Sequence, residues 1–516
     1  MRDIWSRNVV GGVALIVISA ISLTLPGLGP ARQALASAAL SPAAAVPAHE
    51  PEASTASLAR NAPRPDTADV RACGSLPRFA PDTAAQIMAG RLTISPFKAV
   101  TIDPGKNGGI DWFMNPYDDP TWVLDFQTGT WIEALVEGYL AGGKQAGAQR
   151  ARAKAILAGW LADVPLASQN PQTLMCSAEA FPGQAWIHDR IPALLDYYAA
   201  HWQGAYNHGL SQDLELLRAG CAYPVNQWGG QPLTWRQTAR DQMIASFEPN
   251  RYGAAVDAQG AADEQSTGYE NFTFGLWTTA EADLAACHQS PLPSADRDRI
   301  AKMALFLALA TQPDGRLAQI GDTYAIRPRD RPGTPLQFAA TKGAAGTPPG
   351  QRVAVYTAGY VFGRSGWGTM GSFGKMSFYS LRFGPGRLIH GHADHMGLTY
   401  CARGRDLIVN SGHDGYDNNA YRAYLLSPEA ASTFVMPDVP FDASAATRLT
   451  ADGIAAKAQF YEFADTAFGG HARDRRQVAL PGQVIPAGRR ESSAARPART
   501  RAGCRAARTS GPQRPW

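Results

Sequence analysis

Apolar residues in the first half of the chain recur at the three- and four-residue spacing of amphipathic helices. The spacing begins near Asp82 and continues to about Gln312, and Gly, Pro and Asn cluster between the periodic runs, as turns require. The sequence contains no fixed short repeat of the solenoid kind. We therefore predict several antiparallel helix pairs with long irregular links. The clearest runs are 130–143, 151–164, 191–202, 210–221, 274–287 and 298–312.

The pattern changes after about Gly350, where short segments alternate apolar and polar residues between turn residues. Such alternation predicts an antiparallel β-domain, most simply a β-sandwich. Helices first and strands second predict two stacked domains and not an interleaved sheet, and 516 residues suffice for two large cores. The expected strand segments are 352–367, 375–384, 396–412, 431–441 and 454–468.

The N-terminal segment has the features of an export signal. Two arginines precede an apolar run over 9–25, and the small residues 34–36 fit signal-peptidase cleavage. We expect a signal peptide over 1–36 and a disordered Ala/Pro-rich linker over 37–70, with an uncleaved membrane anchor as the alternative to cleavage. The body would then be secreted or lie in the cell envelope, with no membrane attachment after cleavage.

The C-terminal segment 486–516 is basic and almost without apolar residues. It holds eight arginines against one glutamate, a net +7, which leaves about −3 for the rest of a chain whose total is +4. We predict a disordered tail, which is either a basic segment for an anionic polymer or non-native sequence such as an out-of-frame read. We favour the second reading, under which the β-domain lacks its last strands. The body carries no electrostatic signature of a nucleic-acid partner.

The six cysteines match neither a zinc ribbon nor a CxxC redox motif. In an exported chain one or two disulfides are expected, and the sequence leaves their pairing open. The simpler expectation is that the cysteines are buried or singly paired. They are Cys73, Cys176, Cys221, Cys287, Cys401 and Cys504.

A dense histidine cluster, HGHADHMG, occupies residues 390–397. Its spacing is that of the metallo-β-lactamase motif, so a zinc hydrolase has to be considered. A two-metal site needs further His ligands and a bridging Asp, but only His413 and His471 follow, and no Asp follows Asp474. We keep the zinc hydrolase as the less favoured alternative. The cluster residues are His390, His392, Asp394 and His395.

The surroundings of this cluster resemble the C-terminal domain of the heparinase II/III family of polysaccharide lyases. The resemblance rests on an Arg-x-Gly-Trp strand end, a His-x-His-x-Asp turn and a following hairpin, in the family's order and spacing. It extends upstream to 206–220 and 264–272, and spans most of Asp82 to Arg476. The matching positions are Arg364, Gly366, Trp367, His390, His392, Asp394 and Gly404 to Gly412.

This resemblance implies an incomplete α/α toroid over 71–345, followed by an antiparallel β-sandwich over 346–485, with the active cleft between them. It also implies a secreted enzyme that cleaves a uronic-acid-containing polysaccharide by β-elimination, with an anionic polysaccharide as its partner. A catalytically inactive glycan-binding protein of the same fold is the alternative. Elimination would create a conjugated C4–C5 double bond that absorbs ultraviolet light, which mere binding does not.

β-Elimination requires neutralisation of the uronate carboxylate, a base near C5 and an acid for the C4 oxygen. By the resemblance, Asn207 and His208 neutralise the carboxylate, the histidine as an imidazolium. Tyr269 donates the proton to the leaving oxygen, and in some family members also acts as base, for which the phenol pKa would have to fall. His390 matches the family's base. The segment with Tyr269 looks like an exposed polar link before a helix.

Four further residues are candidates for substrate binding. Trp186, His188 and Arg190 lie on a segment that resembles the family's cleft-lining helix, and Arg422 is a comparable candidate in the β-domain. An arginine holds a carboxylate by two parallel hydrogen bonds, and a tryptophan offers a face for a sugar ring. Interdomain packing is an equally good explanation for each.

The resemblance also bears on metal binding. In the zinc-binding members the second histidine of the turn, here His392, ligates zinc with a hairpin Asp and a later His. The corresponding positions here are Asn410 and Ala431, the latter followed by Ser432. One histidine and a neutral amide make a weak zinc site, so His392 is only a weak metal candidate.

We therefore predict no cofactor and no structural zinc unless His413 or Asp414 substitutes for the missing ligands. His392 and Asp394 would then orient His390 and hold the turn together.

Overall fold

The structure is a computed structural model. It describes residues 79–80, 82–102, 109–223, 225, 228, 230–249, 254–436, 438–455, 458–468 and the backbone of strand 472–479. The predicted signal peptide, linker and basic tail lie outside the described residues. None of the described helices is both long and apolar enough to cross a membrane.

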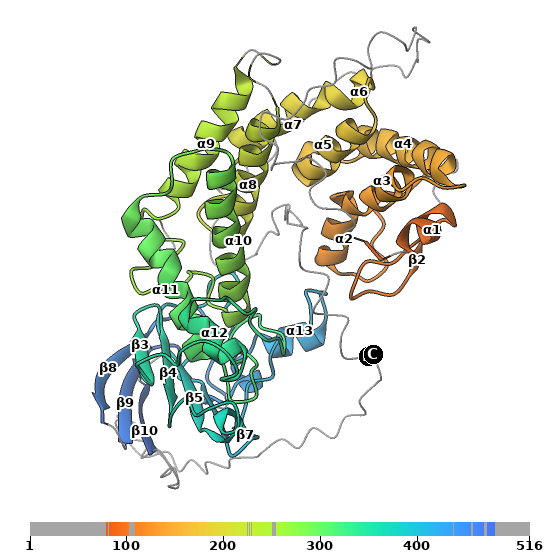
Figure 1. Cartoon of the computed structure of the whole chain (residues 1–516). Helices are drawn as coiled ribbons and strands as arrows, with labels where there is room; N and C mark the ends of the chain where they lie inside the picture. Colours follow the sequence, from red (N-terminus) through yellow and green to blue (C-terminus); the bar gives the residue numbers. More distant parts are fainter. Residues whose placement is uncertain are drawn as a thin grey trace, which may run out of the picture.

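The helical half forms an open arc. Figure 1 shows the helices following one another from α1 to α11, with the β-domain beneath α11 and α12 at one end. A two-stranded sheet of β1 (Arg91–Leu92) and β2 (Val100–Thr101) lies near its start. All six predicted helical runs are confirmed. The helices are α1 (Thr83–Met88), α2 (Pro120–Gln127), α3 (Glu133–Leu140), α4 (Ala146–Asp163), α5 (Pro171–Ala180), α6 (Ala185–His188), α7 (Arg190–Ala200), α8 (Asn207–Ala222), α9 (Gln231–Ala245), α10 (Thr267–Ala286), α11 (Ser294–Ala310) and α12 (Pro335–Ala340).

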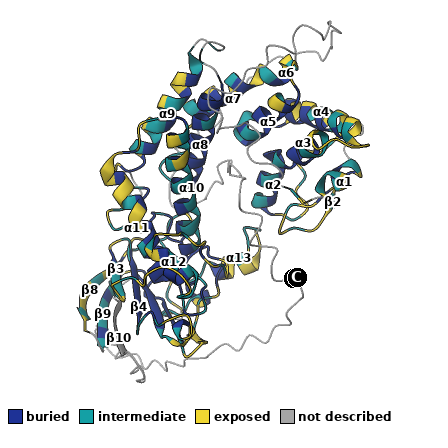
Figure 2. Cartoon of the chain, viewed as in Figure 1, coloured by how far each residue is buried: buried dark blue, intermediate teal, exposed yellow. Residues whose placement is uncertain are grey.

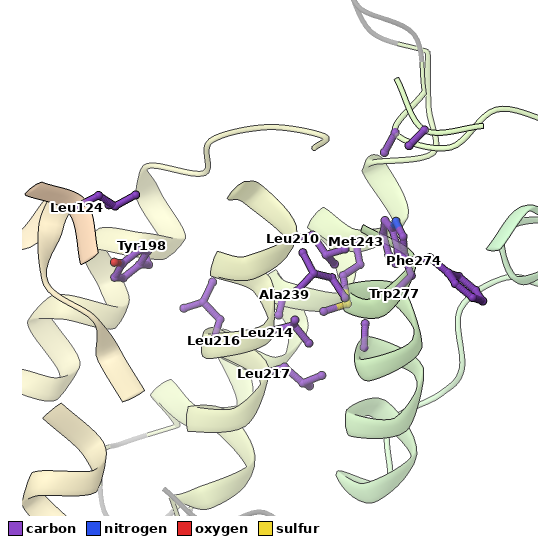
Figure 3. Close-up of a cluster of buried hydrophobic side chains, with 14 of the residues drawn as sticks. Leu124, Tyr198, Leu210, Leu214, Leu216, Leu217, Ala239, Met243, Phe274 and Trp277 are labelled. Atoms are coloured by element: carbon purple, nitrogen blue, oxygen red, sulfur yellow. The ribbon is translucent and has the colours of Figure 1, made fainter. Parts of the chain in front are cut away.

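Helix α8 is the most deeply buried helix of the arc. Every residue of it except Arg218 is buried (Figure 2). Leu210 and Leu214 belong to one hydrophobic cluster with Met243 of α9 and Trp277 of α10 (Figure 3). Because the helix is surrounded on all sides, the polar residues at its first turn are also buried and must find partners inside the protein.

Disulfides tie parts of the helical half together. Cys221 at the end of α8 is bonded to Cys287 directly after α10, 66 residues apart. Cys176 is also disulfide-bonded, whereas Cys401 is a buried free thiol. The expectation of one or two disulfides is thus confirmed, and the structure supplies a pairing that the sequence left open.

The C-terminal half is an antiparallel β-sandwich, as predicted. One sheet has the order β3-β4-β5-β6-β7 and the other the order β10-β9-β8, with every pair antiparallel. Val361, Leu381, Tyr461 and Phe463 are among the side chains packed between the sheets. The strands are β3 (Val353–Tyr356), β4 (Tyr360–Arg364), β5 (Phe378–Arg382), β6 (Leu398–Ala402), β7 (Arg405–Ile408), β8 (Thr447–Ile454), β9 (Ala458–Asp465) and β10 (Ala472–Ala479).

Strands β4 and β5 are buried on both faces, which simple alternation does not predict. One face meets the second sheet, and the other packs on the helical half, where Phe306 of α11 contacts the rings of Tyr360 and Phe362. Arg364 strengthens this junction, because its guanidinium donates to the Thr311 carbonyl of the helical half. Arg364 of the Arg-x-Gly-Trp motif therefore contributes to the packing of the two halves.

The strand predicted over 431–441 is wrong, since its described residues form no strand. Backbone groups there make single bonds and no ladder: the Ser432 amide donates to the side chain of Asn410 (3.1 Å), and the Ser432 carbonyl accepts from the Leu398 amide of β6 (3.0 Å). A short helix that we did not predict, α13 (Ala420–Leu425), lies between the sandwich and the open side of the arc (Figure 1). Its N-cap is Asn419, whose side chain accepts from the Arg422 amide at 2.8 Å.

Candidate active site

His390 lies in the segment between β5 and β6, residues 383–397, which we call the histidine turn. Loops of the helical half hold it in place. The Gln265 side chain accepts from the Leu388 amide (2.8 Å), and the Asp322 amide donates to the His390 carbonyl (2.8 Å). Gly321 has a φ of +60°, and a Cβ there would lie 2.5 Å from that carbonyl oxygen, so the position requires glycine.

The four polar residues of the turn do not share one site. His390 and His392 face Asp322, at 3.1 and 2.9 Å. Asp394 instead lies 3.9 Å from the buried Arg382 guanidinium, whose charge needs a counter-charge, and His395 faces a different aspartate. The prediction that Asp394 orients His390 is therefore wrong. The same split leaves no common metal site for the whole motif.

Asp322 is the centre of the site, and we call it and its donors the Asp322 cluster. The carboxylate is fully buried and bound on both oxygens. Burial alone would raise its pKa, but hydrogen bonds from the histidines and the arginine hold that pKa well below its usual range. The contacting atoms are His392 Nε2 (2.9 Å), His413 Nδ1 (3.0 Å) and Arg422 Nη1 (2.6 Å) at Oδ1, and Tyr416 Oη (3.0 Å), Arg422 Nη2 (3.0 Å) and His390 Nδ1 (3.1 Å) at Oδ2.

Tyr269 lies directly on His390. The two rings are nearly parallel, 9° apart, with centroids separated by 3.4 Å. Tyr269 is in the first turn of α10, whose N-cap Ser266 accepts from its amide at 3.2 Å, and its hydroxyl is 2.7 Å from that of Tyr416. Burial raises the pKa of Tyr269, and the Tyr416 bond only partly opposes this. The phenol therefore stays protonated, which suits an acid and not a base.

Asn207 reaches His390 through a buried glutamate. Its side-chain amide donates to Glu264, whose same oxygen lies 3.4 Å from His390 Nε2, and Thr273 donates to the other oxygen at 2.9 Å. Burial raises the pKa of Glu264, opposed by His390 and Asn207. The prediction of an exposed link before Tyr269 is wrong, because residues 264–267 are buried.

His208 follows Asn207 at the start of α8. Its Nδ1 lies 3.0 Å from Gln203 Oε1, and its ring stacks on Tyr206. Burial first, and then repulsion from His390, lower the pKa of His208 to about 3. The ring is therefore neutral in the free protein at neutral pH, and the imidazolium that we expected would have to form together with a bound carboxylate.

Three predicted substrate-binding residues lie elsewhere. Figure 1 shows α6 at the top of the arc, away from α13. Arg190 donates to the Leu161 carbonyl (3.1 Å), the His188 ring lies 4.9 Å from that of Trp228, and Trp186 is partly exposed. Within the described residues no contact joins these three to the Asp322 cluster, and two of them take part in packing. The fourth candidate, Arg422, belongs to the cluster.

Comparison with solved structures identifies the architecture. A heparan sulfate lyase from Pedobacter heparinus matches with a TM-score of 0.54 and 17% identity, over 80% of this chain and 68% of that one. A heparinase III matches with a TM-score of 0.56 and 16% identity, over 82% and 71%. The chain has the fold of these polysaccharide lyases. No protein-family model and no curated protein matches it.

Within this lyase fold, sequence reasoning missed Asp322, Glu264 and Tyr416. Asp322 stands in a Gly-Asp-Thr link before the β-domain, and Tyr416 stands in a loop rich in Gly, Asp and Asn. The available signal was their place in polar loops near the boundary between the two domains, where sites are commonly built. Each meets at least one partner across a long stretch of sequence, 68 residues between Asp322 and His390 and 57 between Glu264 and Asn207.

The metal set of the zinc-binding members does not fit this chain. The side-chain amide of Asn410 is hydrogen-bonded to backbone groups: its nitrogen donates to the Gln319 carbonyl (3.2 Å), and its oxygen accepts from the Ser432 amide (3.1 Å). Ala431 offers no ligand. A different trio does have metal-like spacing: donor atoms of Asp322, His392 and His413 lie within 4.8 Å of one another. His413 was the substitute that we considered from the sequence.

Proposed function

We propose that this protein is a polysaccharide lyase that cleaves a uronic-acid-containing polysaccharide by β-elimination. The observation that carries the proposal is the parallel stack of Tyr269 on His390. It brings together a protonated phenol and an imidazole from opposite halves of the chain, the two groups that would serve as acid and base in an elimination. An anionic polysaccharide is the partner, and the export expected from the N-terminal segment fits a polymer met outside the cytoplasm.

His390 is the base. Its Nδ1 is directed at Asp322, so the carboxylate fixes the tautomer that keeps the proton on Nδ1 and the lone pair on Nε2. Nε2 is buried, makes no hydrogen bond among the described residues and lies 3.4 Å from Glu264 Oε2, and in this proposal it takes the C5 proton of the bound substrate. Tyr269 protonates the C4 oxygen as the C4–O bond breaks, and the electron pair of the C5–H bond forms the C4–C5 double bond.

Asn207 and His208 hold the uronate carboxylate. The amide of Asn207 is aligned by Glu264, and His208 is neutral before substrate arrives. An incoming carboxylate raises the histidine pKa, so substrate and proton bind together. This neutralisation stabilises the enolate-like intermediate, which is where most of the rate enhancement in such reactions arises.

The other two functions are less well supported. A zinc hydrolase would need the histidine-turn residues around shared metal ions, but Asp394 pairs with Arg382 and His395 faces Asp465. An inactive glycan-binding protein would have the same fold, but binding alone does not require Tyr269 to stack on His390 while His390 contacts Asp322. We therefore place the enzyme reading first.

The test is ultraviolet absorbance while the purified chain is offered a panel of glycosaminoglycans, alginate and other uronate polymers. We expect a rising signal on one polymer class, insensitive to chelator. Tyr269→Phe and His390→Ala should each lower the rate by at least about 10²-fold, the usual size of one acid–base contribution. Tyr421→Phe is the matched control, since Tyr421 is 51% exposed on α13.

A folded chain that binds one of these polymers without producing the absorbing product would support the binding reading instead. Activity that disappears with chelator and returns with zinc would support the hydrolase.

A further inference from the structure

A side chain of the protein, Arg422, already contacts the trio of Asp322, His392 and His413 that has metal-like spacing. Arg422 Nη1 lies 2.6 Å from Asp322 Oδ1 and 2.8 Å from His413 Nδ1. His392 Nε2 is 2.9 Å from the same Asp322 oxygen. One guanidinium nitrogen thus contacts the ligand atoms of two of the three candidate ligands.

Arg422 is held firmly in this position. Its second nitrogen, Nη2, donates to the other Asp322 oxygen at 3.0 Å, so the pair is bidentate and both partners are oriented. Its guanidinium carbon lies 4.9 Å from the centre of the Tyr416 ring. The side chain is 12% exposed, and its own helix, α13, is capped by Asn419. Such a guanidinium is a permanent positive charge at any physiological pH.

We propose that Arg422 is a built-in cation that replaces a divalent metal beside His390, and that removing its charge opens a transition-metal site formed by Asp322, His392 and His413. The trio then has the composition of an open three-ligand zinc site, two imidazoles and one carboxylate. In the wild-type chain the guanidinium keeps a metal out by occupancy and by charge repulsion. This inference does not depend on whether the chain is a lyase.

The consequence for the wild-type chain is that no metal is needed for the geometry around His390. The guanidinium contacts both Asp322 and His413 in place of an ion.

The experiment compares metal uptake by the wild type and by Arg422→Met, which keeps the length of the side chain without its charge. Both are incubated with Co²⁺ or Zn²⁺, dialysed, and measured for metal content and for the visible absorption of tetrahedral Co²⁺. We expect essentially no uptake by the wild type and about one ion per chain in Arg422→Met. The thermal midpoint of the variant should rise with Zn²⁺, because the ion binds only the folded state.

Two controls tie the result to this site. Arg387→Met removes a neighbouring guanidinium that donates to the Gly391 carbonyl, and it should take up no metal. Adding His413→Ala to Arg422→Met should abolish the uptake. If Arg422→Met folds poorly alone, the inference predicts that Zn²⁺ restores its folding, and that it does not restore folding of the double variant.

Stoichiometric uptake by the wild type that is lost in His392→Ala would overturn the proposal, because a metal would then displace the arginine. So would an Arg422→Met chain that is folded by circular dichroism and takes up no Co²⁺, or one that misfolds and is not rescued by Zn²⁺.

Discussion

Replacement of Asp322 by asparagine removes the one negative charge that the site is built around. The carboxylate is contacted by Arg422, Tyr416 and three histidines. An asparagine of the same shape has a single acceptor oxygen, and its NH₂ group would face donors. The change therefore leaves a buried guanidinium without its counter-charge and His390 without the group that fixes its tautomer.

The expected cost follows from burial. Asp322 is fully buried and the Arg422 side chain is 12% exposed, so solvent screens the lost pair only weakly. Breaking a buried ion pair by removing one partner costs about 3–5 kcal/mol. Loss of the carboxylate that orients a histidine base lowers kcat by up to about 10⁴-fold in serine proteases. We expect Asp322→Asn to lower the free energy of unfolding by the first amount and the elimination rate by at least about 10²-fold.

The assay is denaturant unfolding followed by circular dichroism, together with the ultraviolet elimination rate. Asp406→Asn is the control, since Asp406 also faces an arginine, Arg316 at 3.4 Å, but both side chains are about two-fifths exposed, and such pairs contribute about 0–1 kcal/mol. An Asp322→Asn chain that keeps both its stability and its rate, like the control, would refute the central place given to this carboxylate.

Three further changes test separate parts of the structure. Folding lowers the pKa of His208 from the ordinary 6.5 to about 3, so between these pH values the unfolded chain binds the proton more readily than the folded chain. The contribution of neutral His208 to the free energy of unfolding is therefore fully present above pH 6.5 and is lost as the pH falls toward 3. Unfolding measured across this range should show a shallower loss in His208→Gln, by at most about 1.4 kcal/mol per pH unit, and an unchanged slope would contradict the burial argument. Replacement of both Cys221 and Cys287 by serine opens a loop of 66 residues and should lower the free energy of unfolding by about 4 kcal/mol; a denaturant midpoint equal to that of the wild type would show that the crosslink is not stabilising. Gly321→Ala should lose about 1–3 kcal/mol and some elimination activity, whereas Gly333→Ala, which has φ of +77° but no atom within 4 Å of the added Cβ, should lose less; equal losses would mean that strain alone, and not the crowding at the histidine turn, explains the effect.

The sequence predicted the architecture well where the signal is local. Helical periodicity identified α4, α8 and α11, and alternation identified β5, because each pattern lies within one segment. It failed over 431–441, where alternation continues but the described backbone forms no strand and makes only single bonds to its neighbours. It also gave no sign that β4 and β5 are covered on both faces, since that depends on where α11 packs.

For the site, motif reasoning selected residues that do meet in space. Tyr269 and His390 stack, and Asn207 reaches His390 through Glu264. The groups that organise them, above all Asp322, were missed, because no local pattern marks a carboxylate whose donors lie 68 to 100 residues away.

The segment that carries Trp186, His188 and Arg190 lies away from the Asp322 cluster. A resemblance of one segment placed it in the cleft, but only the course of the whole helical arc determines where α6 lies (Figure 1). A role for these residues in substrate binding stays a prediction.

The central claim is that this chain breaks its polymer by elimination. The most direct measurement is the mass of the products formed in water enriched in heavy oxygen. Elimination adds no water, so we predict unsaturated fragments without heavy oxygen, which form with the wild type and not with Tyr269→Phe. Fragments that each carry one heavy oxygen atom and lack the double bond would show hydrolysis and contradict the account.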